Sequence, residues 1–357
     1  MFEDIKIQSH KGPYSACFNE DLVQMVMKIP MENSHFIVDS RVANLYADVL
    51  SPILQSKKVI LIEANEKSKE IERIIPIFEQ LIGNAARRDH TLFAIGGGVI
   101  QDITCFIASI FLRGLDWVFV PTTLLAQTDS CIGSKSSINI KGVKNILGTF
   151  NPPSKIYIFP QFLNTLTDRE IDSGVGEILK VHAIDSAESF DSLAEDYANL
   201  KSDRATLNRY IHRSLSIKKK YIEIDEFDRN IRNIFNYGHS FGHAIESATE
   251  YLIPHGIAVS LGMDMANHIA ASRGITPFIH YKRMHGVLRK NYNLYSCTSI
   301  SHDKVMFALS QDKKNTSTKL SLIFPVGVSA QIQKVEVLND EVFRKQCIEF
   351  LEGIKDE

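Results

Sequence analysis

The chain has 357 residues, of which 44% are apolar and 23% charged, a globular balance whose length indicates two domains. A formal net charge of −2 excludes the basic footprint that binding to nucleic acid or to an anionic membrane surface would need. No run approaches the ~20 apolar residues of a bilayer-crossing helix, so we expect neither a nucleic-acid partner nor a membrane.

The cysteines are scattered and form no Cys-x-x-Cys pair, which indicates neither a disulfide framework nor a thiolate zinc site. They are Cys17, Cys105, Cys131, Cys297 and Cys347. The N-terminal residues carry acid where a signal peptide carries base, and no apolar segment follows them. We therefore expect a protein of the reducing cytoplasm.

Short apolar runs alternate with helix-like stretches in the first half of the chain. The runs predict strands over residues 34–38, 58–63, 92–95 and 117–120. This alternation favours a Rossmann-like α/β domain with a mostly parallel sheet. In such a sheet, ligands bind outside the carboxyl ends of the strands.

Long helical patterns dominate from about residue 162. Apolar residues at three- and four-residue spacing predict helices over residues 207–223, 234–249 and 256–272. The segment over residues 319–324 predicts an isolated strand or part of a hairpin. We place a boundary near residue 165, with an α/β domain over residues 1–165 and a mainly α-helical domain over residues 166–357.

Three consecutive glycines, Gly96, Gly97 and Gly98, follow the third strand and open a predicted helix. Glycine lets the backbone approach a pyrophosphate, and a helix N-terminus favours its negative charge. The G-x-G-x-x-G spacing is absent, so a plain tight turn explains these glycines equally well.

A turn-rich segment that is dense in polar residues comes next. Its members are Asp129, Ser130, Gly133, Lys135, Lys144 and Asn145. Lysine and asparagine side chains that converge in a crevice suit a phosphate and a carboxylate on a small substrate. A solvated loop would have the same composition.

Two histidines, His239 and His243, stand four residues apart, so on a helix they share one face. Ser240 stands where the two-histidine zinc protease signature needs glutamate, which excludes that class. His255 and Glu177 could complete a site of nitrogen and oxygen ligands that leaves coordination positions open. By spacing alone, such a pair is more often a core or surface feature than a ligand set.

Several segments together, in this order, resemble the 3-dehydroquinate synthase family of sugar phosphate cyclases. The resemblance runs from about residue 35 to about residue 330. The segments are 96–102 (GGGVIQD), 112–114 (LRG), 120–130 (VPTTLLAQTDS), 144–148 (KNILG), 177–180 (EILK), 236–243 (NYGHSFGH) and 312–314 (DKK).

The resemblance implies one divalent metal, zinc or cobalt, on Glu177, His239 and His255, and it makes His243 a contact of the substrate phosphate. It implies that NAD is bound by Asp39, Glu66, Lys69, Gly97, Gly98, Val99, Asp102, Thr122, Thr123, Asp129, Ser130, Lys144, Thr165 and Leu166. The other matching catalytic and substrate positions are Asp129, Lys135, Asn145, Lys180, Lys218, Arg232, Asn236, Lys313 and Lys314. Arg113 matches an arginine that reaches the site of the neighbouring subunit, which implies a homodimer.

The implied reaction is that of a lyase, which converts 3-deoxy-D-arabino-heptulosonate 7-phosphate into 3-dehydroquinate and phosphate. It belongs to the shikimate pathway of aromatic amino acid biosynthesis. In this family NAD takes a hydride and later returns it, phosphate leaves by elimination, and an internal aldol step closes the ring. NAD would then bind to residues 1–165 and the metal and substrate to residues 166–357, with the active site in the cleft between the domains.

Some residues beside the expected pocket depart from the family pattern, and they bear on the substrate rather than on the reaction type. They are Gln101, Ser134, Ser136, Ser137, Ile140, Lys141, Val143 and His182. The alternatives are a sister cyclase that makes an amino-dehydroquinate or another cyclitol, and a metal-dependent polyol dehydrogenase. A non-catalytic paralogue is a third alternative.

Overall fold

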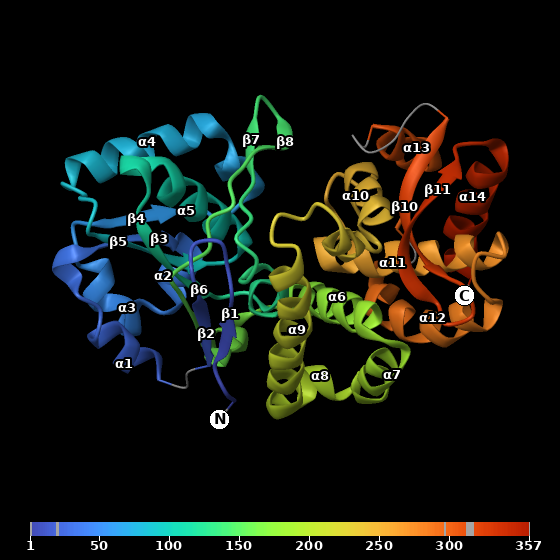
Figure 1. Ribbon diagram of the computed structural model, residues 1–357, viewed down its shortest axis with the longest axis horizontal. Helices are drawn as coiled ribbons and strands as arrows, with labels where there is room; N and C mark the ends of the chain where they lie inside the picture. The colour runs from blue at the N-terminus through green and yellow to red at the C-terminus, as the bar shows by residue number, and fades with distance from the viewer. Residues whose placement is uncertain (1, 19–20, 296–297, 312–317, 357) are drawn as a thin grey trace. The chain divides into compact units, whose positions relative to one another are not determined.

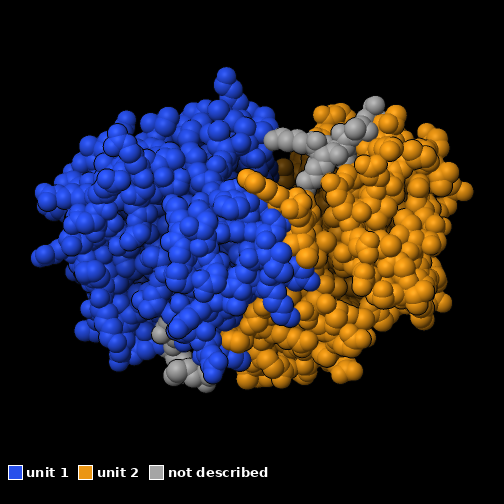
Figure 2. Space-filling view, in the orientation of Figure 1, with its two compact units in different colours: residues 1–166, 218–228 blue, residues 167–217, 229–357 orange. Residues whose placement is uncertain are grey.

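The computed structural model describes residues 2–18, 21–295, 298–311 and 318–356. The chain divides into two compact units, which Figure 2 shows in different colours. Unit 1 comprises Met1–Leu166 and Lys218–Asp228, and unit 2 comprises Thr167–Ile217 and Arg229–Glu357. The expected domains, residues 1–165 and 166–357, stay a prediction, and the units add that Lys218–Asp228 packs within unit 1.

Unit 1 is built on a seven-stranded sheet in the order β1-β2-β9-β6-β5-β3-β4 (Figure 1). The strands are β1 (Ile5–Ile7), β2 (Tyr14–Phe18), β3 (Ser34–Asp39), β4 (Val59–Ile62), β5 (Thr91–Gly96), β6 (Asp116–Pro121) and β9 (Lys155–Ile158). β1 pairs antiparallel with β2, and the pairings from β2 across to β4 are parallel. The mostly parallel sheet and the four expected strands, now β3 to β6, are confirmed.

The apolar runs become strands because both faces of this sheet are covered. Phe36, Phe93 and Val118 occupy neighbouring strands and belong to one buried cluster that also includes residues of the helices α1, α2 and α3. The opposite face carries α4 and α5 (Figure 1). These helices are α1 (Leu22–Met27), α2 (Ser40–Leu45), α3 (Ala47–Leu54), α4 (Ile71–Gly83) and α5 (Gly98–Ile110).

A small antiparallel hairpin, β7 (Ile138–Ile140) and β8 (Val143–Leu147), projects from unit 1 within the polar segment expected to be turn-rich. A single turn of π-helix, Ala126–Ser130, precedes it. This polar segment therefore contains a helical turn and a hairpin rather than one open loop.

Unit 2 is mainly helical, and α11 lies at its centre, since most of its residues are buried. The helices are α6 (Asp168–Asp185), α7 (Ala187–Asp196), α8 (Asn199–Ser202), α9 (Arg204–Ile224), α10 (His239–Ala248), α11 (His255–Ser272), α12 (Phe278–Tyr292), α13 (His302–Ser310) and α14 (Glu341–Asp356). The last part of α9 belongs to unit 1. A hairpin of β10 (Lys319–Val326) and β11 (Gln331–Leu338) confirms the expected strand near residue 320.

The helices expected over residues 207–223 and 256–272 are confirmed as α9 and α11, but the one expected over residues 234–249 is wrong at its start. Ile231–Asn236 is a 3₁₀ turn, and α10 begins only at His239. Gly238 lies between the 3₁₀ turn and α10. Its φ of +75° is a left-handed conformation that separates the two elements. Within the described residues, none of the helices is both long enough and apolar enough to cross a bilayer.

Candidate functional site

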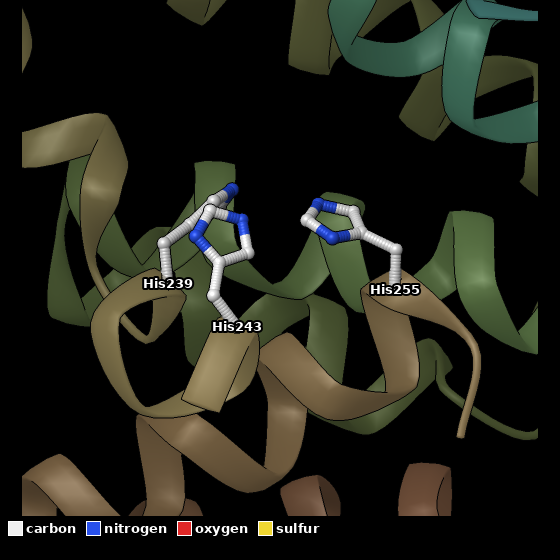
Figure 3. Close-up of side chains that lie close together, drawn as sticks. All are labelled: His239, His243 and His255. Carbon is white, nitrogen blue, oxygen red and sulfur yellow. The ribbon is translucent and has the colours of Figure 1, made fainter. Parts of the chain in front are cut away.

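Three histidines of unit 2 meet at the beginnings of two helices (Figure 3). His239 is the first residue of α10, His243 follows one turn later, and His255 is the first residue of α11. Each offers a ring nitrogen within 4.8 Å of those of the other two. The ring centroids lie 5.2–5.5 Å apart. The expected proximity of His239 and His255 is therefore present in the structure.

Glu177, on α6, supplies a carboxylate to the same place. Its Oε1 lies 3.2 Å from His255 Nε2 and 3.8 Å from His239 Nε2. The Glu177 side chain is only 1% exposed, whereas His243 is exposed. The structure thus brings together all three residues that the resemblance assigned to the metal, with His243 beside them at the surface.

Close helix crossings explain how residues so far apart in sequence converge. A Cβ on Gly176 would lie 1.9 Å from the carbonyl oxygen of Gly256, so α6 and α11 touch backbone to backbone beside Glu177 and His255. A Cβ on Gly262 of α11 would lie 2.1 Å from the carbonyl oxygen of Gly238, at the start of α10. The absence of side chains at these crossings places the ligand-bearing helix ends next to one another.

Each of the two imidazoles that face Glu177 also has a polar contact at its other ring nitrogen, Nδ1. Nδ1 of His239 donates to the backbone carbonyl of Tyr237 at 3.2 Å. Nδ1 of His255 lies 3.2 Å from Oε2 of Glu246, a residue of α10. With Nδ1 occupied in this way, Nε2 of each ring is the nitrogen that faces the Glu177 carboxylate.

The site is electrostatically polarised. Burial alone would raise the pKa of Glu177, but the Lys180 ammonium, 2.5 Å from Oε2, and the two imidazoles hold it well below its usual range. Burial and Lys180 together lower the pKa of His239 well below its usual value. Burial would also lower the pKa of His255, but its contacts with Glu177 and Glu246 raise it to about 10.

This donor set fits a divalent transition metal. One buried carboxylate oxygen and two imidazole nitrogens are the ligand types that zinc and cobalt take in catalytic sites, and three protein ligands leave positions for substrate. A metal binds imidazole in its neutral form, so binding here would displace the proton that His255 carries in the free protein.

Lys180, Arg232 and Asn236 also belong to unit 2. The Lys180 ammonium lies 5.6 Å from the centre of the Phe235 ring, and the residue is 1% exposed. Arg232 is buried, and Asn236 donates to the carbonyl of Asn233 at 3.0 Å. Both belong to the 3₁₀ turn that leads into α10. Lys313 and Lys314 lie outside the described residues.

A second group of expected site residues lies in unit 1 at the carboxyl ends of β5 and β6. Gly97 is the N-cap of α5, so the helix begins immediately after the strand. A Cβ on Gly97 would lie 2.9 Å from Cγ2 of Thr123, which follows β6. Gly98, Val99 and buried Thr122 border the same turn. The open N-terminus of α5 offers unsatisfied N–H groups to an anion.

Lys69 is the centre of a buried polar network beside this turn. Its ammonium lies 2.9 Å from Asp102 Oδ2, 3.2 Å from Asn145 Oδ1 and 3.6 Å from Glu66 Oε1. Ser137 donates to both Asp102 oxygens, from its backbone N–H at 3.1 Å and from its hydroxyl at 3.0 Å. The structure therefore joins Asn145 to Lys69 and Asp102, two residues expected to bind NAD.

Two ion pairs connect further expected residues of unit 1. Lys218, in the part of α9 that belongs to this unit, lies 2.8 Å from Asp129 Oδ1 and also donates to the Asp129 carbonyl at 2.5 Å. Lys135 pairs with the carboxylate of Asp228. Each lysine thus already has a carboxylate partner. An anionic substrate would either displace that carboxylate from the ammonium or bind beside it.

Gln101, a departure from the family pattern, holds Ser130 with two hydrogen bonds. The Gln101 amide nitrogen donates to the Ser130 carbonyl at 2.6 Å, and the Ser130 hydroxyl donates to the Gln101 carbonyl at 2.6 Å. Gln101 is 5% exposed and belongs to the first turn of α5. It therefore ties the π-helical turn that carries Asp129 to the glycine-rich turn.

The remaining expected residues occupy separate places in unit 1. Asp39 caps α2 by accepting from the Arg41 N–H at 2.9 Å. Thr165 and Leu166 end the 3₁₀ turn that follows β9, and Lys144 lies exposed on β8. Arg113 is exposed with a φ of +67°.

Sequence reasoning missed several residues that hold the site together. Glu246 stands seven residues after His239 and three after His243, so it shares their helix face and helical spacing could have found it. Ser137 and Gln101 were noted only as departures from the family pattern, and spacing could not predict their hydrogen bonds, because their partners are 29–35 residues away in sequence.

Comparisons with known proteins cover most of the chain. Residues 59–173 match the model of the 3-dehydroquinate synthase N-terminal domain, and residues 174–315 match the C-terminal domain. A curated relative, 3-dehydroquinate synthase of Thermoanaerobacter sp., is 33% identical over 350 residues, which cover 96% of this chain and 98% of the relative.

Two solved structures have similar folds. A 2-deoxy-scyllo-inosose synthase with carbaglucose-6-phosphate, NAD⁺ and Co²⁺ has a TM-score of 0.84 at 24% identity, covering 99% of this chain and 100% of that one. A 2-epi-5-epi-valiolone synthase from Streptomyces hygroscopicus, with NAD⁺ and Zn²⁺, has a TM-score of 0.80 at 25% identity, covering 96% and 97%.

Proposed function

The chain belongs to the 3-dehydroquinate synthase family of lyases, and from this premise we propose that it converts 3-deoxy-D-arabino-heptulosonate 7-phosphate into 3-dehydroquinate and phosphate. Product and phosphate together have the elemental composition of the substrate, so the conversion involves no net oxidation. NAD and one divalent metal ion serve as cofactors.

The convergence of Glu177, His239 and His255 is the observation that carries the proposal. These three side chains come from three helices, and the Nε2 atoms of the two histidines lie 3.2 and 3.8 Å from Glu177 Oε1. We infer that they hold the metal. Bound there, the ion would supply Lewis-acid polarisation of a substrate hydroxyl, and NAD, which we assign to Gly97 and Gly98, would supply a reversible hydride acceptor.

The protein's own groups then bind and orient the substrate. His243 is exposed beside the ligand set and can donate to a phosphate oxygen without being a ligand itself. Arg232 is the natural bidentate partner of a carboxylate, and Asn236 stands on the same turn. The buried ammonium of Lys180 keeps Glu177 ionised, because it compensates the charge of that carboxylate.

In unit 1, we assign Lys69 and Asp102 to the nucleotide, with Asn145 hydrogen-bonded to Lys69 as a link to the substrate phosphate. Asp129 and Lys218 form a pair whose polar atoms can share a substrate hydroxyl. Lys135 is half exposed beside Asp228, which leaves its ammonium accessible to a phosphate. The expected cleft between the domains stays a prediction.

We further infer a homodimer in which Arg113 enters the site of the neighbouring subunit. Leu112, Arg113 and Gly114 have φ values of +51°, +67° and +125°. Glycine adopts a positive φ freely, but for Leu112 and Arg113 this conformation is costly in a turn that serves only to connect two elements. The described cysteines are buried free thiols, which supports work in a reducing cytoplasm.

A phosphate-release assay tests the proposed reaction. The purified chain is given NAD, zinc or cobalt, and the heptulosonate phosphate, while phosphate and NADH absorbance are followed together. We expect phosphate release without accumulation of NADH, and 3-dehydroquinate as the product by mass spectrometry. The same substrate lacking its phosphate group is the control and should give no 3-dehydroquinate.

Other outcomes would reassign the chain. Accumulation of NADH without phosphate release would point to a polyol dehydrogenase. Phosphate release only from a different sugar phosphate would identify a sister cyclase.

A further inference from the structure

Glu246 stands behind one of the three proposed metal ligands. Its Oε2 lies 3.2 Å from His255 Nδ1, while Oε1 of Glu177 lies 3.2 Å from Nε2 of the same ring. The two nitrogens of an imidazole point in different directions, so Glu246 contacts the nitrogen that does not face Glu177. Both nitrogens of the His255 ring therefore contact carboxylates, and the two carboxylates come from different helices.

His255 needs such support more than His239 does. Both histidines begin a helix, so neither has a preceding helical turn beside it, and the difference lies in the exposure of His255. Its side chain is 32% exposed, compared with 15% for His239. His239 is oriented by a backbone carbonyl, that of Tyr237, whereas the orienting contact of His255 comes from a side chain.

Glu246 is itself well placed for this role. It lies on the face of α10 that carries His239 and His243, and its side chain is only 12% exposed. A partly buried carboxylate that accepts the Nδ1 proton keeps that proton on Nδ1, so Nε2 is the nitrogen that gives up its proton to a metal.

We propose that Glu246 is a positioning residue of the metal site, which holds the His255 ring so that Nε2 meets the ion bound by Glu177 and His239. This inference rests on the proposed function, because it presumes that these residues bind a metal. It adds a residue to which no metal or substrate role was assigned from the sequence.

Metal affinity measured without substrate tests the proposal. Apo-protein is titrated with Zn²⁺ or Co²⁺ by equilibrium dialysis, and the visible absorption of bound Co²⁺ reports the coordination geometry. We expect Glu246→Ala to weaken binding by about 10–100-fold, the usual effect of removing an outer-sphere partner, and to change the Co²⁺ spectrum. Glu250→Ala is the matched control, because Glu250 lies just past the end of α10 with an 86% exposed side chain.

Two conservative variants separate position from charge. Glu246→Gln keeps an acceptor at the same reach but removes the charge, and it should retain most of the affinity. Glu246→Asp keeps the charge but withdraws the oxygen by one methylene, and it should bind nearly as weakly as Glu246→Ala. Each variant is first checked for a native thermal unfolding transition.

The opposite results would overturn the proposal. If Glu246→Asp binds like the wild type and Glu246→Gln does not, Glu246 acts through its charge alone. If all three variants bind metal as tightly as the wild type, Glu246 does not position His255, although the proposed function still stands. If the wild-type chain binds no metal, both the proposal and the proposed function are wrong.

Discussion

At the scale of single residues, the site depends on ionisable groups kept in chosen protonation states by their neighbours. The Lys180 ammonium compensates the charge of buried Glu177 at 2.5 Å, which removes the main obstacle to burying that carboxylate. His182, two residues beyond Lys180, is instead a buried side chain that is kept neutral. It is fully buried, its Nδ1 donates to the Ile178 carbonyl at 2.9 Å, and its ring packs against Tyr210.

The burial of His182 predicts a pH-dependent stability. Burial lowers its pKa from 6.5 to about 4. Between these two pH values, His182 is therefore protonated in the unfolded chain but neutral in the folded chain. The free energy of unfolding should therefore fall as the pH is lowered from about 6.5 towards 4, by up to ~1.4 kcal/mol per pH unit for this residue. His35 and His280 have pKa values lowered in the same direction and add to the slope.

Urea unfolding at pH 7, 6 and 5 measures this effect. In His182→Phe the aromatic packing is kept but the titrating group is gone, so the loss of stability between pH 7 and 5 should be smaller than in the wild type. An equal loss in both proteins would show that His182 does not titrate in this way.

At the scale of secondary-structure elements, the metal site is a product of helix packing. α6, α10 and α11 each supply a ligand close to a glycine at a backbone contact, so the spacing between helices sets the spacing between ligands. Gly176 and Gly256 are adjacent in sequence to Glu177 and His255. A change in the spacing of α6 and α11 at this crossing would therefore change the distance between the Glu177 and His255 side chains.

Gly176→Ala should separate α6 from α11. The added methyl group would lie 1.9 Å from the Gly256 carbonyl oxygen, so the helices must shift and the contact between Glu177 and His255 must lengthen. We expect a loss of about 1–3 kcal/mol of stability and weaker binding of metal. Gly286→Ala is the control, because this glycine of α12 has nothing within 4 Å of its added Cβ and the change should be neutral or stabilising.

Chemical denaturation gives the stability of both variants, and metal titration gives their affinities. Unchanged metal affinity in a destabilised Gly176→Ala protein would mean that the ligands tolerate a wider crossing than the structure indicates.

At the scale of the whole molecule, each unit contains one group of the expected site residues. Unit 1 holds the expected nucleotide residues around the start of α5, and unit 2 holds the expected metal ligands at the starts of α10 and α11 and within α6. The inferred homodimer adds a third contribution, since Arg113 would act in the site of the partner.

Mixing two inactive variants tests whether Arg113 acts in the partner's site. Arg113→Ala and Glu177→Gln homodimers each lack one group at both sites, but a mixed dimer would contain one complete site. If half of the dimers are mixed, about a quarter of the wild-type activity should return after subunit exchange. Glu177→Gln mixed with His255→Ala is the control and should regain none. The absence of recovery from the first mixture, with exchange verified, would place Arg113 in its own site or outside any site.

Much of the fold could be predicted from the sequence, because buried parallel strands appear as continuous apolar runs. Residues 92–95 are an example, in β5. The start of α10 could not be predicted, since apolar spacing continues through Gly238, whereas the backbone leaves the helical conformation at Tyr237 (ψ 127°) and Gly238 (φ +75°). The Lys69 network could not be predicted from spacing either, because Asn145 reaches Lys69 across 76 residues through the fold. For the metal ligands, spacing alone favoured pairing His239 with His243, and the family resemblance indicated His255 instead.

The measurement that tests the central claim most directly is made on Glu177→Gln, with bound metal and phosphate release followed on the same sample. Glutamine keeps the size of the side chain but removes the charged oxygen that faces both imidazoles. We predict that metal content and phosphate release fall together, whereas Glu250→Gln, altered at an exposed position, keeps both. Full activity in Glu177→Gln, or activity that persists after its metal is lost, would contradict the account.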